Sequence, residues 1–245
     1  MQRIIKGASL TDIGLKRNKN EDAASVSIND DYCLAIVADG IGGHRKGEVA
    51  SDMTIGIVSN HLSNVTKTLN LSRVKKVIKT AIKDANKEIN DLSVKPDYLD
   101  MGTTLVLSVI LPDKTYVANI GDSRLYTFSQ SKGLEKITVD HTYVEYMVRI
   151  GKMTREEAMN SPQKNVLLNA IGINPSVYYD DYILDNNYDA LLLCSDGLYN
   201  MVSEKEINSV LLDVLTSEEK CRKLVDLANS HGGVDNIGIS LLEVK

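Results

Sequence analysis

The amino-acid sequence predicts an α+β protein built from antiparallel sheets, and two observations lead to this fold class. Segments with strand-like and helix-like patterns are grouped along the chain instead of alternating strictly, which is typical of α+β proteins. The strand-like segments between residues 103 and 138 are joined by short turn-like connections, PDK and QSKG, and short connections imply antiparallel pairing. No internal repeat or Pro/Ser-rich linker divides the 245 residues, so we expect one domain, residues 1–245.

The first half of the chain begins with strands and continues with helices. Strand-like patterns occupy residues 4–10, 23–28 and 32–38. From Glu48 the pattern becomes helical. The second helix is marked by apolar residues at helical spacing, with lysines on the other face: Val74, Val77, Ile78, Ala81, Ile82, Ala85 and Ile89.

Strands return from Thr103. They are predicted at residues 103–111, 115–121, 123–129 and 134–138. Two short helical segments, TYVEYMVRIG and TREEAMNS, then interrupt the strands. The remaining elements are strands at residues 177–184 and 189–195, helices at about Ser203–Asp213 and Ser217–Ser230, and a strand at residues 236–244. Runs such as LVLSVIL and ALLLC are apolar on both faces, so both faces should be covered, as in a layered sandwich with helices outside.

Composition excludes several classes of function. The formal net charge is -5 and there is no long basic run, which argues against nucleic acid or an anionic membrane surface as partner. The 3 cysteines have no metal-binding spacing and indicate reduced thiols. No segment has the pattern of a signal peptide or the roughly 18 apolar residues of a membrane span. We therefore expect a cytoplasmic protein.

The chemically informative feature is a set of aspartates at the ends of strand-like segments. A carboxylate at the mouth of an apolar strand is costly to desolvate unless a cation meets it, and no equal set of Lys or Arg stands nearby in sequence. One such aspartate is usually a turn or cap residue, but several beside glycines indicate a site for hard divalent cations. All-oxygen ligation favours magnesium or manganese over zinc. The set is Asp22, Asp39, Asp122, Asp196 and Asp235.

Six motifs around these aspartates resemble those of the bacterial type 2C (PPM family) serine/threonine protein phosphatases, in the same order. They are DIGLKRNKNED (Asp12 to Asp22), ADGIGGH (Ala38 to His44), MGTTL (Met101 to Leu105), GDSRLY (Gly121 to Tyr126), CSDGL (Cys194 to Leu198) and GGVDNI (Gly232 to Ile237). The resemblance implies a four-layer α-β-β-α sandwich, with two central antiparallel sheets flanked by helices. It also implies a metal-dependent hydrolase acting on phosphoserine and phosphothreonine in proteins.

The resemblance assigns metal-binding roles position by position. Asp39 is similar to the carboxylate that bridges two Mn2+ or Mg2+ ions, and the carbonyl of Gly40 would bind one of them. Asp196 and Asp235 correspond to ligands of the other ion. Asp122 resembles the residue that holds a third, weaker ion together with Asp196. Asp22 corresponds to an acidic position that contributes to the metal shell, and the role of Glu21 beside it stays open.

The resemblance also implies how hydrolysis proceeds. A water that bridges two metal ions has a pKa near neutrality and attacks phosphorus directly. Arg17 is similar to the arginine that grips the substrate phosphate. His44 is the candidate general acid for the leaving group, and a structural histidine of its loop is the alternative.

The segment from His141 to about Ile173 corresponds to the family's flap over the site, with an ordinary helical connection as the alternative. The partners implied are phosphorylated Ser/Thr proteins, including a Ser/Thr kinase of the same cell, and the expected state is a monomer.

Other interpretations remain to be tested. A catalytically inactive scaffold of the same fold would usually lack one of the metal-binding aspartates, and none is missing. An ATP-binding domain of the histidine-kinase/Hsp90 type shares the DxGxG pattern at Asp39, but it requires an asparagine on a helix upstream. A calcium-binding module would need the EF-hand spacing, which is absent.

Overall fold

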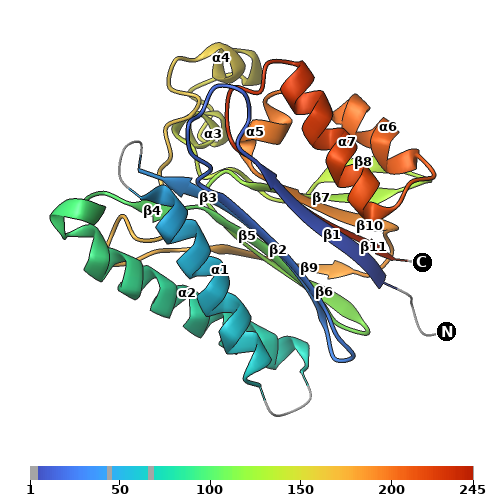
Figure 1. The fold of residues 1–245 in the computed structure, drawn as a ribbon, viewed down its shortest axis with the longest axis horizontal. Helices are drawn as coiled ribbons and strands as arrows, with labels where there is room; N and C mark the ends of the chain where they lie inside the picture. Colours follow the sequence, from blue (N-terminus) through green and yellow to red (C-terminus); the bar gives the residue numbers. More distant parts are fainter. Residues whose placement is uncertain (1–4, 43–45, 66–68, 245) are drawn as a thin grey trace.

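The computed structural model in Figure 1 describes residues 5–42, 46–65 and 69–244. The strands of these residues are β1 (Ile5–Asp12), β2 (Asp22–Ile28), β3 (Cys33–Ile41), β4 (Gly102–Thr103), β5 (Leu105–Ile110), β6 (Lys114–Ile120), β7 (Arg124–Ser129), β8 (Gly133–Lys136), β9 (Asp180–Asp185), β10 (Ala190–Cys194) and β11 (Ile237–Val244). The helices are α1 (Gly47–Ser63), α2 (Leu71–Ser93), η1 (Pro96–Tyr98), α3 (Tyr143–Arg149), α4 (Arg155–Asn160), α5 (Asp196–Tyr199), α6 (Glu204–Leu212) and α7 (Ser217–Ser230).

The strands form two antiparallel sheets that lie face to face. One sheet has five strands in the order β1-β11-β10-β7-β8. The other has six, in the order β2-β3-β5-β6-β9, with β4 pairing to the end of β3. Helices α1 and α2 cover the outer face of the six-stranded sheet, and α5, α6 and α7 cover the other (Figure 1). The predicted four-layer α-β-β-α sandwich is therefore confirmed.

Three buried apolar layers hold the sandwich together. One lies between the two sheets and includes Val37, Val106 and Leu193. The other two lie between each sheet and its helices. All residues of β5 and of β10 are buried, as the apolar runs LVLSVIL and ALLLC predict for strands covered on both faces.

Local signals set the ends of several helices. Thr154, Ser203 and Thr216 begin α4, α6 and α7, and each accepts a hydrogen bond from the backbone N–H three residues later. Glu157, Glu206 and Glu219 return the contact to the capping backbone and complete three capping boxes. None of the helices in the described ranges is long and apolar enough to cross a membrane.

One expectation from the sequence was wrong. The short connection between β6 and β7 predicts an antiparallel pair, but β6 belongs to the six-stranded sheet and β7 to the five-stranded one. The chain crosses between sheets at Gly121, where φ is +93°. A β-carbon there would lie 2.6 Å from the Thr104 side chain, so the crossing requires glycine.

The fold also bears on the ATP-binding alternative. In the described part of the chain, β1, β2 and β3 are the elements that precede Asp39, and no helix lies upstream of it. The helix-borne asparagine that an ATP-binding domain of the histidine-kinase/Hsp90 type requires therefore has no counterpart there.

Candidate active site

Two of the predicted carboxylates lie opposite each other on neighbouring strands. Asp22 is the first residue of β2, Asp39 lies near the end of β3, and the two are register partners. Ser195 Oγ donates a hydrogen bond to Asp22 Oδ2 at 2.6 Å. The backbone N–H of Asp39 donates to Thr104 Oγ1 at 2.9 Å. Both carboxylates therefore lie at the same end of the six-stranded sheet.

The other three carboxylates come from the five-stranded sheet and from the crossing between sheets. Asp196 is the first residue of α5, directly after β10. Asp235 lies just before β11, the antiparallel partner of β10. Asp122 occupies the crossing between β6 and β7. The strand ends of both sheets thus bring five carboxylates to one end of the sandwich.

The carboxylates are close enough to raise one another's pKa. Burial and then repulsion by Asp196 and Asp235 raise the pKa of Asp22 to about 8. Burial and then the charge of Asp196 raise the pKa of Asp122 to about 7. The pKa of Asp196 rises to about 6 through burial and then Asp235. The pKa of Asp39 lies well above its usual value because of burial and the other four carboxylates.

Two arginines lie near the carboxylates, and both are already paired. Arg17, on the loop between β1 and β2, donates a hydrogen bond from Nη2 to Asp235 Oδ2 at 2.8 Å. Arg124 stacks on the ring of Tyr199 and donates to Asp140 from Nε and Nη2, at 2.8 to 3.2 Å. The negative charge of the five carboxylates therefore exceeds the positive charge beside it, which fits a site for divalent cations.

Close packing around Gly40 leaves no room for a side chain. A β-carbon at Gly40 would lie 2.4 Å from the carbonyl of Gly47 and 2.5 Å from the carbonyl oxygen of Glu21. Those neighbours are backbone atoms that cannot turn away, so position 40 requires glycine. The carbonyl of Gly40 is the one backbone oxygen that the sequence analysis predicts as a ligand.

The five carboxylates are oxygen ligands of the kind that hard cations bind. Their side chains are not arranged around a common metal position. No three carboxylate, imidazole or thiol groups of the described residues surround a common point at metal-ligand distance. The carboxylates instead turn to nearby protein donors: Ser195 for Asp22, Arg17 for Asp235, and the side-chain amide of Asn200 for Asp196 at 3.1 Å.

The predictions for Arg17, His44 and Glu21 compare differently with the structure. Arg17 lies at the site, half-exposed, and its contact with Asp235 holds its guanidinium beside the carboxylates. His44 lies outside the described residues. Glu21 is buried and accepts a hydrogen bond from the backbone N–H of Gly47 at 3.2 Å. Glu21 therefore anchors the start of α1.

Sequence reasoning missed three residues that organise the site. Ser195 accepts from the backbone N–H of Gly238 at 2.8 Å while it donates to Asp22, so it joins the two sheets. Thr104 links the backbone of Asp39 to the hydroxyl of Ser123. Asn236 donates to the carbonyls of two loop residues, each at 2.9 Å, and accepts from the N–H of Glu21. The available signal was their position inside the motifs, next to the aspartates.

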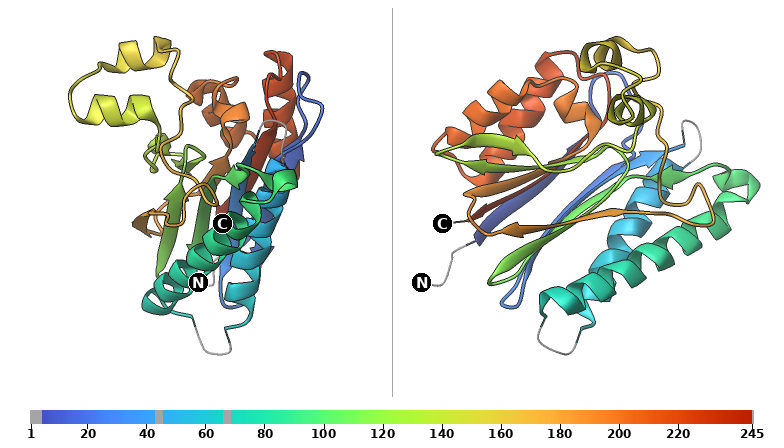
Figure 2. Two further views of the ribbon diagram at one scale, coloured as in Figure 1. Left: turned by 90° about the vertical axis from the view of Figure 1, so that its left-hand side faces the viewer. Right: turned by 180° about the vertical axis from the view of Figure 1, so that it is seen from behind.

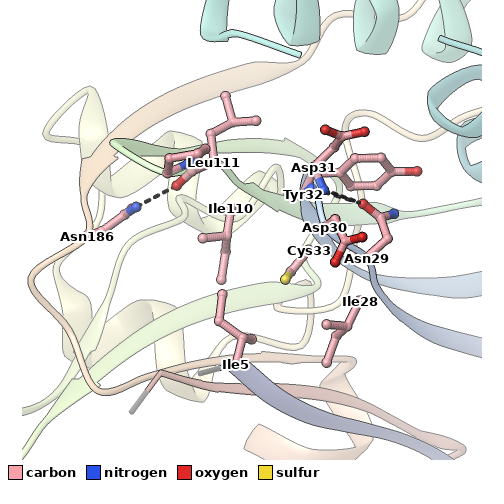
Figure 3. Close-up of a pocket in the computed structure, with 11 residues that line it drawn as sticks. Ile5, Ile28, Asn29, Asp30, Asp31, Tyr32, Cys33, Ile110, Leu111 and Asn186 are labelled. Atoms are coloured by element: carbon pink, nitrogen blue, oxygen red, sulfur yellow. Dashed lines mark hydrogen bonds between the residues drawn. The ribbon is translucent and has the colours of Figure 1, made fainter. Parts of the chain in front are cut away.

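Two grooves differ in their relation to the carboxylates. A groove of about 460 Å³ begins at Asp122 and runs along α3 and α4, past Arg155 and Lys164. In Figure 2 these two helices project from the end of the sandwich. A pocket of about 400 Å³ lies at the β2–β3 turn. Cys33 and Asn186 are among its lining residues (Figure 3). That turn is at the opposite end of β3 from Asp39, so this pocket is not part of the carboxylate site.

The chain is similar to known proteins over most of its length. The family model described as protein phosphatase 2C matches residues 16–229. The serine/threonine phosphatase Stp of Listeria monocytogenes serotype 4b is 41% identical over 95% of this chain and 93% of that protein. Protein phosphatase PhpP of Streptococcus pneumoniae is 34% identical over 96% of each chain.

Solved structures show the same fold. The serine/threonine phosphatase of S. agalactiae is similar with a TM-score of 0.93 at 35% identity, over 99% of this chain and 100% of that one. The catalytic domain of the serine/threonine protein phosphatase PstP, in complex with 2 manganese ions, is similar with a TM-score of 0.84 at 30% identity, over 99% of each chain.

Proposed function

The chain belongs to the protein phosphatase 2C family and is a metal-dependent serine/threonine phosphatase, and we propose that the five strand-end carboxylates are its metal site. The observation that carries this proposal is the convergence of Asp22, Asp39, Asp122, Asp196 and Asp235 from both sheets on one end of the sandwich. Burial and mutual repulsion raise the pKa of the first four, so cations would favour their ionised forms. Oxygen donors of this kind suit Mn2+ or Mg2+.

Each carboxylate has a proposed place in the site. Asp39 would be shared by two ions, and the carbonyl of Gly40 would help to hold one of them. Asp196 and Asp235 would hold the other ion, and Asp22 would contribute to the metal shell. Asp122 and Asp196 would hold a third, weaker ion. The positions at the ends of β2, β3 and β10 and in the β6–β7 crossing support a shared metal site, because the carboxylates approach the same region from both sheets.

The chain's own residues bind and orient the phosphoryl group. When bound, the ions lower the pKa of water and so supply a nucleophile near neutral pH. Arg17 spends one of its five N–H donors on Asp235, so its guanidinium can also bind phosphoryl oxygens in a charge-assisted contact. His44 is the proposed proton donor to the departing serine or threonine oxygen.

The substrates that we propose are phosphoserine and phosphothreonine proteins, among them a Ser/Thr kinase of the same cell. The groove beside Asp122 offers room for a peptide between the site and residues 141–173, the proposed flap. We further propose a cytoplasmic monomer. The buried, unpaired thiols of Cys33, Cys194 and Cys221 support a reducing compartment.

Hydrolysis assays test the proposal directly. Para-nitrophenyl phosphate and a phosphothreonine peptide are incubated with manganese, with magnesium, and with EDTA. Turnover that depends on the metal and stops in EDTA is expected, on the peptide as well as on the small ester. No turnover with either metal would contradict the proposal and favour the inactive scaffold.

A further inference from the structure

His141 is the first residue of the flap, residues 141–173. It has no role as a metal ligand or in phosphate binding in the proposed site. The residue is buried, with its side chain 4% exposed, so it does not touch a substrate. Its backbone N–H donates to the carbonyl of Gly121 at 2.9 Å, and its own carbonyl accepts from the N–H of Leu168 at 2.8 Å. His141, the first residue of the flap, thus joins the β6–β7 crossing to Leu168 in the last part of the flap.

The imidazole of His141 also makes contacts to Gly121 and to the last part of the flap. The backbone N–H of Gly121 donates to Nδ1 at 3.2 Å, and the side-chain amide of Asn169 approaches Nδ1 at 2.9 Å. A backbone N–H can only donate, so Nδ1 is the unprotonated nitrogen. The proton is therefore on Nε2, which faces Asp180 Oδ2 at 3.2 Å. Asn169 also donates to the carbonyl of Tyr178 at 2.8 Å. The ring of Tyr178 packs against the imidazole of His141.

The far end of the flap is tied to the other side of the site. Ile171 and Thr103 exchange two backbone hydrogen bonds, at 2.9 and 3.0 Å. Thr103 Oγ1 donates to the carbonyl of Asp39 at 2.9 Å. The flap therefore reaches Asp39 through Thr103, and it reaches Asp122 through Gly121 and His141. Each connection includes one side chain, the Thr103 hydroxyl in the first and the His141 imidazole in the second.

We propose that His141 is a positioning residue: its Nδ1 holds the Gly121–Asp122 turn in a fixed relation to both ends of the flap. The inference rests on the proposed metal-dependent hydrolysis, because Asp122 matters as a ligand of the third ion. Loss of the Nδ1 acceptor leaves the buried N–H of Gly121 unpaired and loosens the turn, which then keeps only the backbone bond from the His141 N–H to the Gly121 carbonyl as its hydrogen bond to residue 141. Partners that orient a metal ligand typically change metal affinity or activity by about 10- to 100-fold when they are removed.

Three substitutions separate the two ring nitrogens. In His141→Asn the side-chain oxygen takes the place of Nδ1 and accepts from Gly121. In His141→Gln the amide reaches the place of Nε2 and contacts Asp180, without an acceptor for Gly121. His141→Ala removes both. Asn186→Ala is the matched control, because Asn186 is also buried and makes two side-chain hydrogen bonds, at the opposite end of the sandwich.

The readouts are kcat and KM for para-nitrophenyl phosphate, manganese affinity by calorimetry, and hydrogen exchange of the Gly121 amide without metal. We expect His141→Ala and His141→Gln to lower kcat about 10- to 100-fold with little change in KM, to weaken the weakest manganese site, and to speed exchange at Gly121. His141→Asn should stay within a few-fold of the wild type in all three. Asn186→Ala should lower the melting temperature and leave kcat and manganese affinity unchanged.

Two results would overturn the inference. One is wild-type kcat and manganese affinity in His141→Gln, and the other is a His141→Asn variant as impaired as His141→Gln. If His141→Ala does not fold, the Asn and Gln variants still decide the matter. A wild-type protein without metal-dependent turnover would contradict the proposed function alone, because exchange at Gly121 in the metal-free Asn and Gln variants tests the role of His141 separately.

Discussion

Without metal ions, the protein should lose stability as the pH rises from 5 to 8. The raised pKa values of Asp22, Asp122 and Asp196 determine the sign. Below its unfolded pKa of about 4, such a carboxyl is neutral in both the folded and the unfolded protein, and its contribution to stability is complete. As the pH rises from that value through the folded-state pKa, this contribution is lost, because the unfolded chain ionises more easily than the folded one.

Asp122 sets the scale of the effect. Asp122 is 8% exposed and its folded-state pKa is about 7. Between pH 5 and 7 its ionisation therefore lowers the free energy of unfolding by about 1.4 kcal/mol for each pH unit, or roughly 3 kcal/mol. The neighbouring carboxylates share the same repulsion, so their contributions do not simply add. For a chain of this size, roughly 3 kcal/mol corresponds to about 6–12 °C in melting temperature.

Thermal unfolding in EDTA at pH 5, 6, 7 and 8 measures this loss. The advantage of the variant Asp122→Asn over the wild type should be roughly 3 kcal/mol larger at pH 8 than at pH 5, and it should disappear below about pH 4. Asp31→Asn, in the exposed β2–β3 turn, is the matched control and should follow the wild type. With manganese the trend should reverse, because the ion binds ionised carboxylates and its stabilisation grows with pH. A flat or rising melting temperature in EDTA over this range would refute the reasoning.

Four further substitutions test individual roles. Asp39→Asn should abolish phosphatase activity and weaken manganese binding while circular dichroism stays native; full activity would remove Asp39 from the metal site. Arg17→Ala should raise KM for a phosphopeptide about 10- to 100-fold, as loss of a charge-assisted hydrogen bond predicts, and an unchanged KM would exclude it from phosphate binding. Asp122→Ala should lower activity but leave two tightly bound ions by elemental analysis, whereas loss of all metal would contradict its assignment to the third ion. Gly197→Ala should lower the melting temperature sharply, because its β-carbon would lie 1.9 Å from the carbonyl oxygen of Asn236; a wild-type melting temperature would show that the backbone there can move.

Much of the fold could be predicted because its signals are local. The apolar spacing from Val74 to Ile89 predicts the helix that the structure has as α2, and Ser217–Ser230 is helical over the predicted range. Continuous apolar runs predicted that β5 and β10 are covered on both faces. Strand-end aspartates indicated which residues converge in the proposed site, because neighbouring strand ends meet at one edge of a sheet.

Other features depend on partners far away in the chain. The contact of Ser195 with Asp22 joins residues 173 positions apart, and no local pattern indicates it. Glu21 precedes Asp22 directly, yet it anchors α1 because the packing brings Gly47 to it. The short helix α5 contains one turn and has no periodicity that a sequence pattern could show.

The sequence by itself determined the elements, the order of the motifs, and which residue types gather at strand ends, because side-chain spacing and turn chemistry are local properties. Only the tertiary structure decided which sheet each strand joins, as at Gly121, where one left-handed residue sends the chain from one sheet to the other. It also decided that Asp22, Asp122 and Asp196 share one charged environment and that His141 lies between the flap and the Asp122 turn. Charge repulsion and hydrogen bonding act through space, so their partners are known only once the sheets are packed.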